Sequence, residues 1–187
     1  MIFSKQLSEI CDIRFGVAEQ TAEIGEIAYI QINQFDDKGI KNDAIQGWLP
    51  NLNRIEAYLL MVGDVLLAAK GNKLFAWAYT DLEGKAVAST SFFILRPKQN
   101  VVNVKYLETY LNTPLAKSSF LQIGAGTNIF SIRKSELGAF QIPLPSLEQQ
   151  KKIAALAELH QKEVQLAQQL IAQKQHLYAA IISKLIK

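Results

Sequence analysis

From Leu147 to Lys187 the chain contains neither glycine nor proline, and this stretch limits the possible folds more than any other part of the sequence. It is rich in Ala, Leu, Gln, Lys and Glu, which include the strongest helix-forming residue types. Ser146, followed three residues later by Gln149, is a capping-box start. The sequence therefore predicts one continuous helix about 60 Å long. A helix of that length would project beyond a domain built from the rest of this chain.

Two prolines separate this helix from the sequence before it. In Ile142-Pro143-Leu144-Pro145 they prevent a continuous helix and favour an extended, stiff connection. A chain of 187 residues, 49% of them hydrophobic, can bury one good core and still supply one extended element. We therefore expect a globular domain over residues 1–145 and a separate long helix over residues 146–187.

The first part of the chain predicts a mostly β scaffold, because short β-branched and aromatic runs alternate there with turn signals such as Lys70-Gly71-Asn72. The expected strands are Ile27–Ile32, Val65–Ala69, Leu74–Thr80 and Ser91–Leu95. Two helices are expected at Val104–Asn112 and Pro114–Ile123, the second with Thr113 as its cap. The predicted fold class is α+β, a mixed, β-rich domain followed by one long C-terminal α-helix.

Composition narrows the class of protein without indicating a function. The balance of 20 Lys and Arg against 17 Asp and Glu gives a net charge of only +3, unlike a non-specific nucleic-acid coat. The single cysteine, Cys11, excludes internal disulfides and a cysteine-based zinc site, and we expect it to be a small buried hydrophobe. No stretch approaches the roughly 20 apolar residues of a membrane span. We expect a soluble protein of the reducing cytoplasm, without membrane association.

Catalytic signatures are weak. Both histidines, His160 and His176, lie in the long helix among Gln and Lys, and we expect them to be solvated rather than to serve as a base or a metal pair. There is no Walker loop, dinucleotide fingerprint or methyl-transfer signature. Asp64, Glu83 and Lys85 resemble the acidic pair and lysine of a metal-dependent nuclease, although residues 81–84 equally resemble an ordinary hairpin turn. A small Mg²⁺-dependent nuclease is therefore the alternative function.

Three loops carry residue types that suit double-stranded DNA, where cations contact phosphates while amides, hydroxyls and guanidinium groups read base edges. The candidates are Gln31 and Asn33 in the first loop, Lys70, Gly71, Asn72 and Lys73 in the second, and Gly126, Thr127, Asn128, Ser131, Arg133 and Lys134 in the third. Each loop taken alone is explained as well by an ordinary solvated connection.

The long helix carries a broad apolar band. Its main positions, which we expect at a dimer interface, are Ile153, Leu156, Leu159, Leu166, Leu170, Leu177 and Ile181, and Val164, Ile171, Tyr178, Ile182 and Leu185 widen the band. His160, Glu163 and Lys174 interrupt the simplest heptad register, so the band is too broad for one coiled-coil seam. We expect the helix to pack against a partner helix on one side and other protein on another. The alternative is a helix folded back onto its own domain.

Several motifs, taken in order, resemble the specificity subunit of type I restriction-modification systems. They are Val62-Gly63-Asp64-Val65-Leu66-Leu67, Lys70-Gly71-Asn72, Tyr106-Leu107, Tyr110-Leu111-Asn112-Thr113-Pro114, Gly126-Thr127 and Ile142-Pro143-Leu144-Pro145-Ser146-Leu147-Glu148-Gln149-Gln150-Lys151-Lys152-Ile153-Ala154. The resemblance runs from about Leu7 to the C-terminus, and the last block is its most specific part.

This resemblance implies a non-catalytic subunit with a target-recognition domain over residues 1–145 and a dimerisation and spacer helix over residues 146–187. The family's usual chain is about twice as long, with two recognition domains and two helices that pair antiparallel. A homodimer pairing its helices as an antiparallel coiled coil would rebuild that arrangement and read an inverted repeat.

The resemblance also implies a DNA methyltransferase subunit as partner, which would hold S-adenosylmethionine, and in some systems a translocating restriction subunit. The helix length limits the unread spacer between the two half-sites to about 15–18 base pairs. A third interpretation, an adaptor that dimerises without binding DNA, is compatible with the low net charge.

Overall fold

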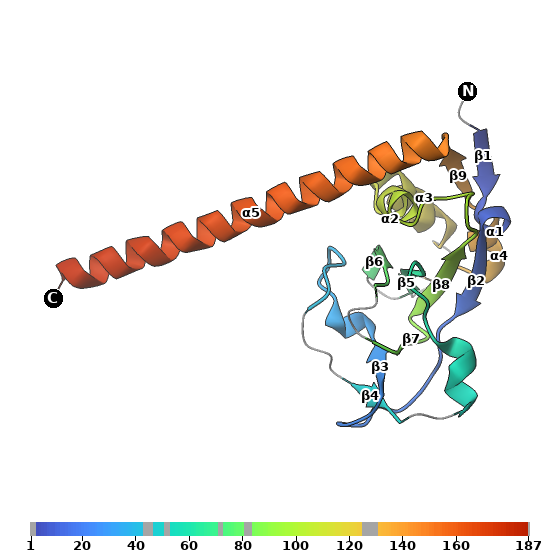
Figure 1. Cartoon of the computed structure of the whole chain (residues 1–187), viewed down its shortest axis with the longest axis horizontal. Helices are drawn as coiled ribbons and strands as arrows, with labels where there is room; N and C mark the ends of the chain where they lie inside the picture. Colours follow the sequence, from blue (N-terminus) through green and yellow to red (C-terminus); the bar gives the residue numbers. More distant parts are fainter. Residues whose placement is uncertain are drawn as a thin grey trace.

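A computed structural model describes residues 3–42, 47–50, 53–70, 73–80, 84–124 and 131–186. It consists of a mixed domain and one helix that projects far beyond it (Figure 1). The strands are β1 (Phe3–Gln6), β2 (Cys11–Phe15), β3 (Ile27–Ile30), β4 (Trp48–Leu49), β5 (Val65–Lys70), β6 (Lys73–Ala78), β7 (Ala86–Ala88), β8 (Phe92–Pro97) and β9 (Gln141–Leu144). The helices are α1 (Leu7–Ile10), α2 (Val104–Leu111), α3 (Pro114–Ile123), α4 (Lys134–Ala139) and α5 (Leu147–Leu185), with 3-10 turns η1 (Ile32–Gln34) and η2 (Asn53–Tyr58). The predicted α+β class is confirmed.

A four-stranded antiparallel sheet of order β2-β8-β5-β6 forms the centre of the domain. Because side chains alternate along a strand, its two faces build two cores. Leu67 and Phe93 pack in the cluster that contains α2 and α3, whereas Leu66 and Phe92 pack in the cluster that contains β3 and β7. The smaller sheet has order β4-β3-β7, and β1 pairs with β9.

The two middle helices begin where their capping residues predict. Asn103 accepts a hydrogen bond from the Tyr106 N–H, and Thr113 accepts one from the Ala116 N–H. The strand boundaries differ from the expectation. β3 ends at Ile30 because the chain turns into η1, and β8 continues two residues past Leu95 to pair with β2. The extended segment Ile142–Pro145 is also more than a connection, since its first residues belong to β9.

The start of α5 is fixed to the domain. Ser146 accepts a hydrogen bond from the Gln149 N–H, as the capping box predicts. The Gln150 side chain is buried, donates to the carbonyls of Pro145 (2.9 Å) and Val101 (3.4 Å), and accepts from the Asn103 N–H at 2.8 Å. Because this amide joins the first turn of α5 to the backbone just before α2, it fixes the direction in which α5 leaves the domain.

Beyond its base α5 extends free of the domain. The side chains from Glu158 to Leu185 are exposed, apart from the partly buried Ile182. The helix spans 39 residues, about 58 Å. The interpretation of α5 as a helix folded back onto its own core is therefore wrong. Among the described residues no helix is long and apolar enough to cross a membrane.

Cys11 is buried in the main core, as expected for a small hydrophobe, and burial raises the pKa of its thiol to about 12. We predict that a thiol reagent at pH 8 labels the folded chain at least about a thousandfold more slowly than the chain in denaturant, because the thiolate is the reactive form. Equal labelling rates would contradict this burial. Since the pKa is raised on folding, the thiol's contribution to stability is complete below pH 9 and is lost as the pH rises towards 12.

Candidate nucleic-acid interface

Two of the three predicted loops meet at one end of the four-stranded sheet. β5 extends past the start of β8 to Lys70, which pairs with Lys73 of β6, and the chain just before α4 lies beside this extension. The Ile132 N–H donates to the carbonyl of Ala69 at 3.3 Å. The second and third loops, separated by some sixty residues in the sequence, are therefore neighbours.

The third contributor, the segment after β3, is held at the same end by aromatic packing. The Phe35 ring lies 4.9 Å from the Phe75 ring and 5.7 Å from the Phe92 ring, centroid to centroid. Lys73 donates to the carbonyl of Phe35, and the Ser89 N–H donates to the carbonyl of Ile30 at 2.9 Å. Gln31 and Asn33 are thereby placed close to the β5–β6 hairpin and the start of β8.

Most of the described candidate side chains in these loops face solvent. Asn33, Ser131, Arg133 and Lys134 are exposed, and Gln31 and Lys73 are partly buried. Arg133 is 81% exposed and lies 4.0 Å from the Glu136 carboxylate, whose other oxygen accepts the Arg133 N–H. The side chain of Lys70 and the candidates Gly71, Asn72, Gly126, Thr127 and Asn128 lie outside the described part of the structure.

Lys134 also borders a hollow of about 380 Å³ that the sequence did not indicate. Arg14, Arg96 and the half-exposed rings of Phe15 and Tyr58 line it. Arginines and open aromatic rings together suit phosphates and nucleobase faces. Arg14 and Arg96 lie on the paired strands β2 and β8, 82 residues apart in the sequence, so only the strand pairing brings them together.

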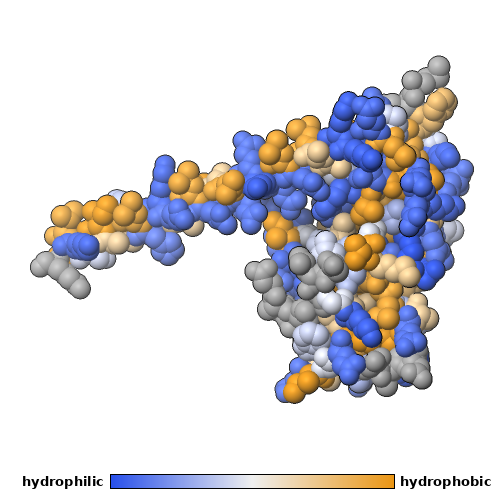
Figure 2. Space-filling model, viewed as in Figure 1, coloured by the Kyte–Doolittle hydropathy of each residue, from blue (hydrophilic) through white to orange (hydrophobic). Residues whose placement is uncertain are grey.

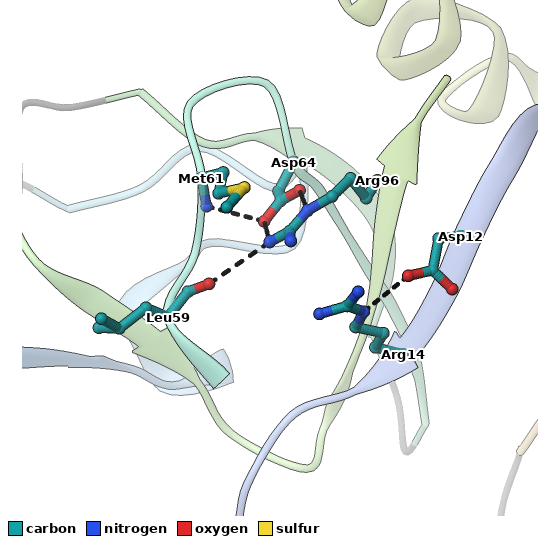
Figure 3. A network of polar contacts seen from close by, with 6 residues as sticks. All are labelled: Asp12, Arg14, Leu59, Met61, Asp64 and Arg96. Carbon is teal, nitrogen blue, oxygen red and sulfur yellow. Dashed lines mark hydrogen bonds and ion pairs between the residues drawn. The ribbon is translucent and has the colours of Figure 1, made fainter. Parts of the chain in front are cut away.

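The nuclease alternative finds no support. Each Asp64 oxygen accepts a hydrogen bond from Arg96 at 2.8 Å, and one of them also accepts the Met61 N–H (Figure 3). This pairing raises the pKa of the Arg96 guanidinium. Lys85 is exposed, and Glu83 lies outside the described residues. No group of three or more His, Cys, Asp or Glu residues able to hold a metal is found in the part of the chain that is described.

The apolar band of α5 is exposed along its length. Its seven main residues are 40% to 68% exposed, and Figure 2 shows orange atoms gathered along the flank of α5 that faces away from the domain. At the base of the helix a notch of about 450 Å³ lies between Thr109 of α2 and the α5 residues Ile153, Leu156 and His160. An apolar surface this long is typical of a protein-binding helix. His160 and His176 are exposed, as predicted.

The family model for the type I restriction modification DNA specificity domain matches residues 4–185. The chain belongs to this family. In this specificity domain the family-like block from Ile142 to Ala154 builds the joint described above, where β9 pairs with β1 and Gln150 fixes the start of α5. The block that gave the strongest sequence signal thus has a structural role at the base of the helix.

Individual relatives agree. The putative type I restriction enzyme MjaX specificity subunit of Methanocaldococcus jannaschii is 31% identical over 106 residues, which cover 54% of this chain and 25% of the relative. The crystal structure of the HsdS subunit from Thermoanaerobacter tengcongensis is 21% identical with a TM-score of 0.62, over 87% of this chain and 38% of that one. The type I restriction-modification S subunit from M. genitalium is 16% identical with a TM-score of 0.64, over 88% and 40%.

These structural likenesses establish the fold of the specificity domain. The chain spans about a quarter of the curated relative and about two fifths of each solved structure. This agrees with the expectation, drawn from the resemblance, of a chain about half the family's usual length with one domain and one long helix.

Proposed function

We propose that the chain is a non-catalytic DNA-recognition module that directs a type I restriction-modification enzyme to its target. The convergence of three loops at one end of the sheet carries this proposal. Cations, amides and hydroxyls that are scattered in the sequence are brought together there, on a rigid support of packed phenylalanines.

The side chains at this end divide by their chemistry. Gln31 and Asn33 have amides of the kind that pair with adenine through two hydrogen bonds, and Arg133 can pair with guanine in the same way. Lys73 and Lys134 suit phosphates, which position a protein without reading sequence. We therefore assign base reading to the first group and positioning on the duplex to the second.

The exposed band on α5 favours a homodimer. In an antiparallel pair the C-terminal turns of the second copy lie near the base of the first helix, where the notch beside Leu156 offers an apolar seat. Two identical domains related by a two-fold axis would read an inverted repeat on either side of an unread spacer. The length of α5 limits that spacer to about 15–18 base pairs.

The band is broader than one helix pair needs, which favours further protein on its other flank. Val164, Ile171, Tyr178 and Leu185 recur every seven residues and form a second row more than about a third of a turn around the helix from Leu159 and Leu166. We assign this row to a DNA methyltransferase subunit, which would hold the S-adenosylmethionine. In systems that cleave DNA, a translocating restriction subunit would join the same assembly.

Mapping of methylated adenines by long-read sequencing tests the proposal. Cells would express this chain with its cognate methyltransferase subunit, and control cells the methyltransferase alone. We expect a new inverted-repeat motif with a fixed spacer. If a purified complex forms but no motif appears, the chain is not a sufficient recognition module, and a half-subunit lacking a second domain or an adaptor without DNA binding takes its place.

A further inference from the structure

A second hollow lies in the angle between α5 and the domain, which we call the elbow hollow. It measures about 580 Å³ and is bounded by the loop after η1, strand β6, helices α2 and α3, and Gln161 of α5. Three lysines line it: Lys38, Lys41 and Lys117. None of the predicted recognition residues lines it, although Lys73 lies 3.9 Å from Asp37, which does.

The loop that carries two of these lysines has a defined conformation. The Asp36 carboxylate accepts hydrogen bonds from the N–H groups of Lys38 and Ile40, at 2.9 and 2.8 Å. Gly39 has a φ of +83°, and a Cβ added there would meet the Phe75 ring at 2.7 Å. Since only glycine fits that turn, Lys38 and Lys41 are presented on a preformed support.

The two acidic side chains that line the elbow hollow pair with lysines that do not line it. Of its two acidic side chains, Glu108 pairs with Lys105 at 2.9 Å and also accepts the Ala78 N–H, while Asp37 lies 3.9 Å from Lys73. Lys117 is partly buried, and burial lowers the pKa of its ammonium group. No carboxylate pairs with Lys117 among the residues that the structure describes. A partly desolvated cation of this kind favours an anionic ligand.

The flank of α5 that continues beyond the elbow hollow carries amides. Gln161, Gln165, Gln168 and Gln175 follow at helical spacing the line that Gln150 begins. From Val164 to the C-terminus the chain contains no Asp or Glu. In Figure 2 blue atoms lie along the flank towards the domain and orange ones along the opposite flank. Amide groups can donate to phosphates, and beyond Glu163 no carboxylate on α5 repels them.

We propose that the elbow hollow and this amide flank hold the sugar–phosphate backbone of the unread DNA just inside the half-site. This inference rests on the proposed function and names a surface beyond the recognition loops. DNA fits better than a protein partner, because lysines line the hollow and amides line the flank, while the main apolar row that includes Leu159 and Leu166 faces the other way. Trp77, with the Lys41 ammonium 6.0 Å from its ring, adds a wall against which a deoxyribose can lie.

The test compares Lys38→Gln/Lys41→Gln/Lys117→Gln with a matched control, Lys5→Gln/Lys98→Gln/Lys152→Gln, which removes equal charge outside the hollow. Both full chains, bound to their methyltransferase, would be titrated by fluorescence anisotropy against two duplexes. One duplex ends at the half-site, and the other continues through the spacer. The spacer gain is the ratio of the affinities for the longer and the shorter duplex. In the first variant we expect this gain to fall at least about tenfold, and the slope of log affinity against log salt concentration to become shallower by about 2–3. The control keeps both, and both variants keep the methylated motif.

Three results would overturn the inference. An unchanged spacer gain and salt slope in the first variant would exclude phosphate contacts in the elbow hollow. Loss of the methyltransferase from that variant, with DNA affinity otherwise unaltered, would assign the hollow to protein. If the unsubstituted complex shows no sequence preference, the proposed function fails and the inference falls with it, so the two failures are distinguishable. Equal thermal unfolding of both variants checks that folding is unaffected.

Discussion

A chain carrying Leu166→Lys and Leu177→Lys is expected to sediment as a monomer at concentrations where the unsubstituted chain is a dimer. These side chains are 55% and 62% exposed in the single chain and would be buried between paired helices. Losing both, and placing two ammonium groups in an apolar seam, costs about 4 kcal/mol or more. The dissociation constant should therefore rise about a thousandfold, as measured by sedimentation velocity.

The matched control places the same charges on the opposite flank, as Gln168→Lys and Gln175→Lys. This variant should remain a dimer, because these positions belong to the amide flank rather than to the apolar band. If the double leucine variant stays dimeric, the seam has been assigned to the wrong residues. If the unsubstituted chain is itself a monomer at high concentration, the homodimer is wrong.

Asp64→Ala is expected to lower the free energy of unfolding by about 3 kcal/mol, the largest stability change that we predict for a single substitution. Asp64 is 1% exposed, and Arg96, which it binds through two hydrogen bonds, is 24% exposed. Removing the carboxylate leaves the guanidinium largely shielded from water and without its partner, and the Met61 N–H loses its acceptor. Urea denaturation followed by circular dichroism measures the change.

The same sheet provides the control, because Asp12 pairs with Arg14 at 2.7 Å on the solvent-exposed surface (Figure 3). These side chains are 52% and 47% exposed, so solvent screens their attraction. Asp12→Ala should therefore change stability by less than about 1 kcal/mol. Equal losses in the two variants would show that burial does not distinguish the two pairs.

The three longer helices, α2, α3 and α5, were predictable from sequence because their signals are local, whereas the short α1 and α4 were not predicted. Asn103, Thr113 and Ser146 each cap a helix through contacts within three residues, and the absence of glycine and proline after Leu147 is sufficient for α5. The strands that escaped prediction depend on distant partners. Phe3 pairs with Leu144 across almost the whole domain, and all four side chains of β1 are exposed, so no alternation marked this strand.

The candidate interface likewise has a part that could be predicted from sequence and a part that could not. The sequence indicated which loops carry suitable groups, because composition and turn residues are local. That the loops meet depends on long-range contacts, such as the hydrogen bond between Ile132 and Ala69 and the ring packing of Phe35 on Phe92. The elbow hollow could not be predicted for the same reason. Neither Lys41 nor Lys117 stands out in the sequence, and they come to line one hollow only when the sheet and helices pack together.

The hydrogen bonds of Gln150 control the angle at which α5 leaves the domain. Beyond Ala157 the free part of α5 is a lever about 40 Å long. A tilt of about 5° at its base would move its far end by about 3.5 Å, close to one base-pair step. In the proposed dimer, the buried Gln150 amide at the base of this lever, bonded at 2.8 to 3.4 Å to three backbone groups, would therefore set how sharply one spacer length is distinguished from the next. Substitutions at this joint would then change the spacing of the proposed half-sites without changing any side chain assigned to base reading.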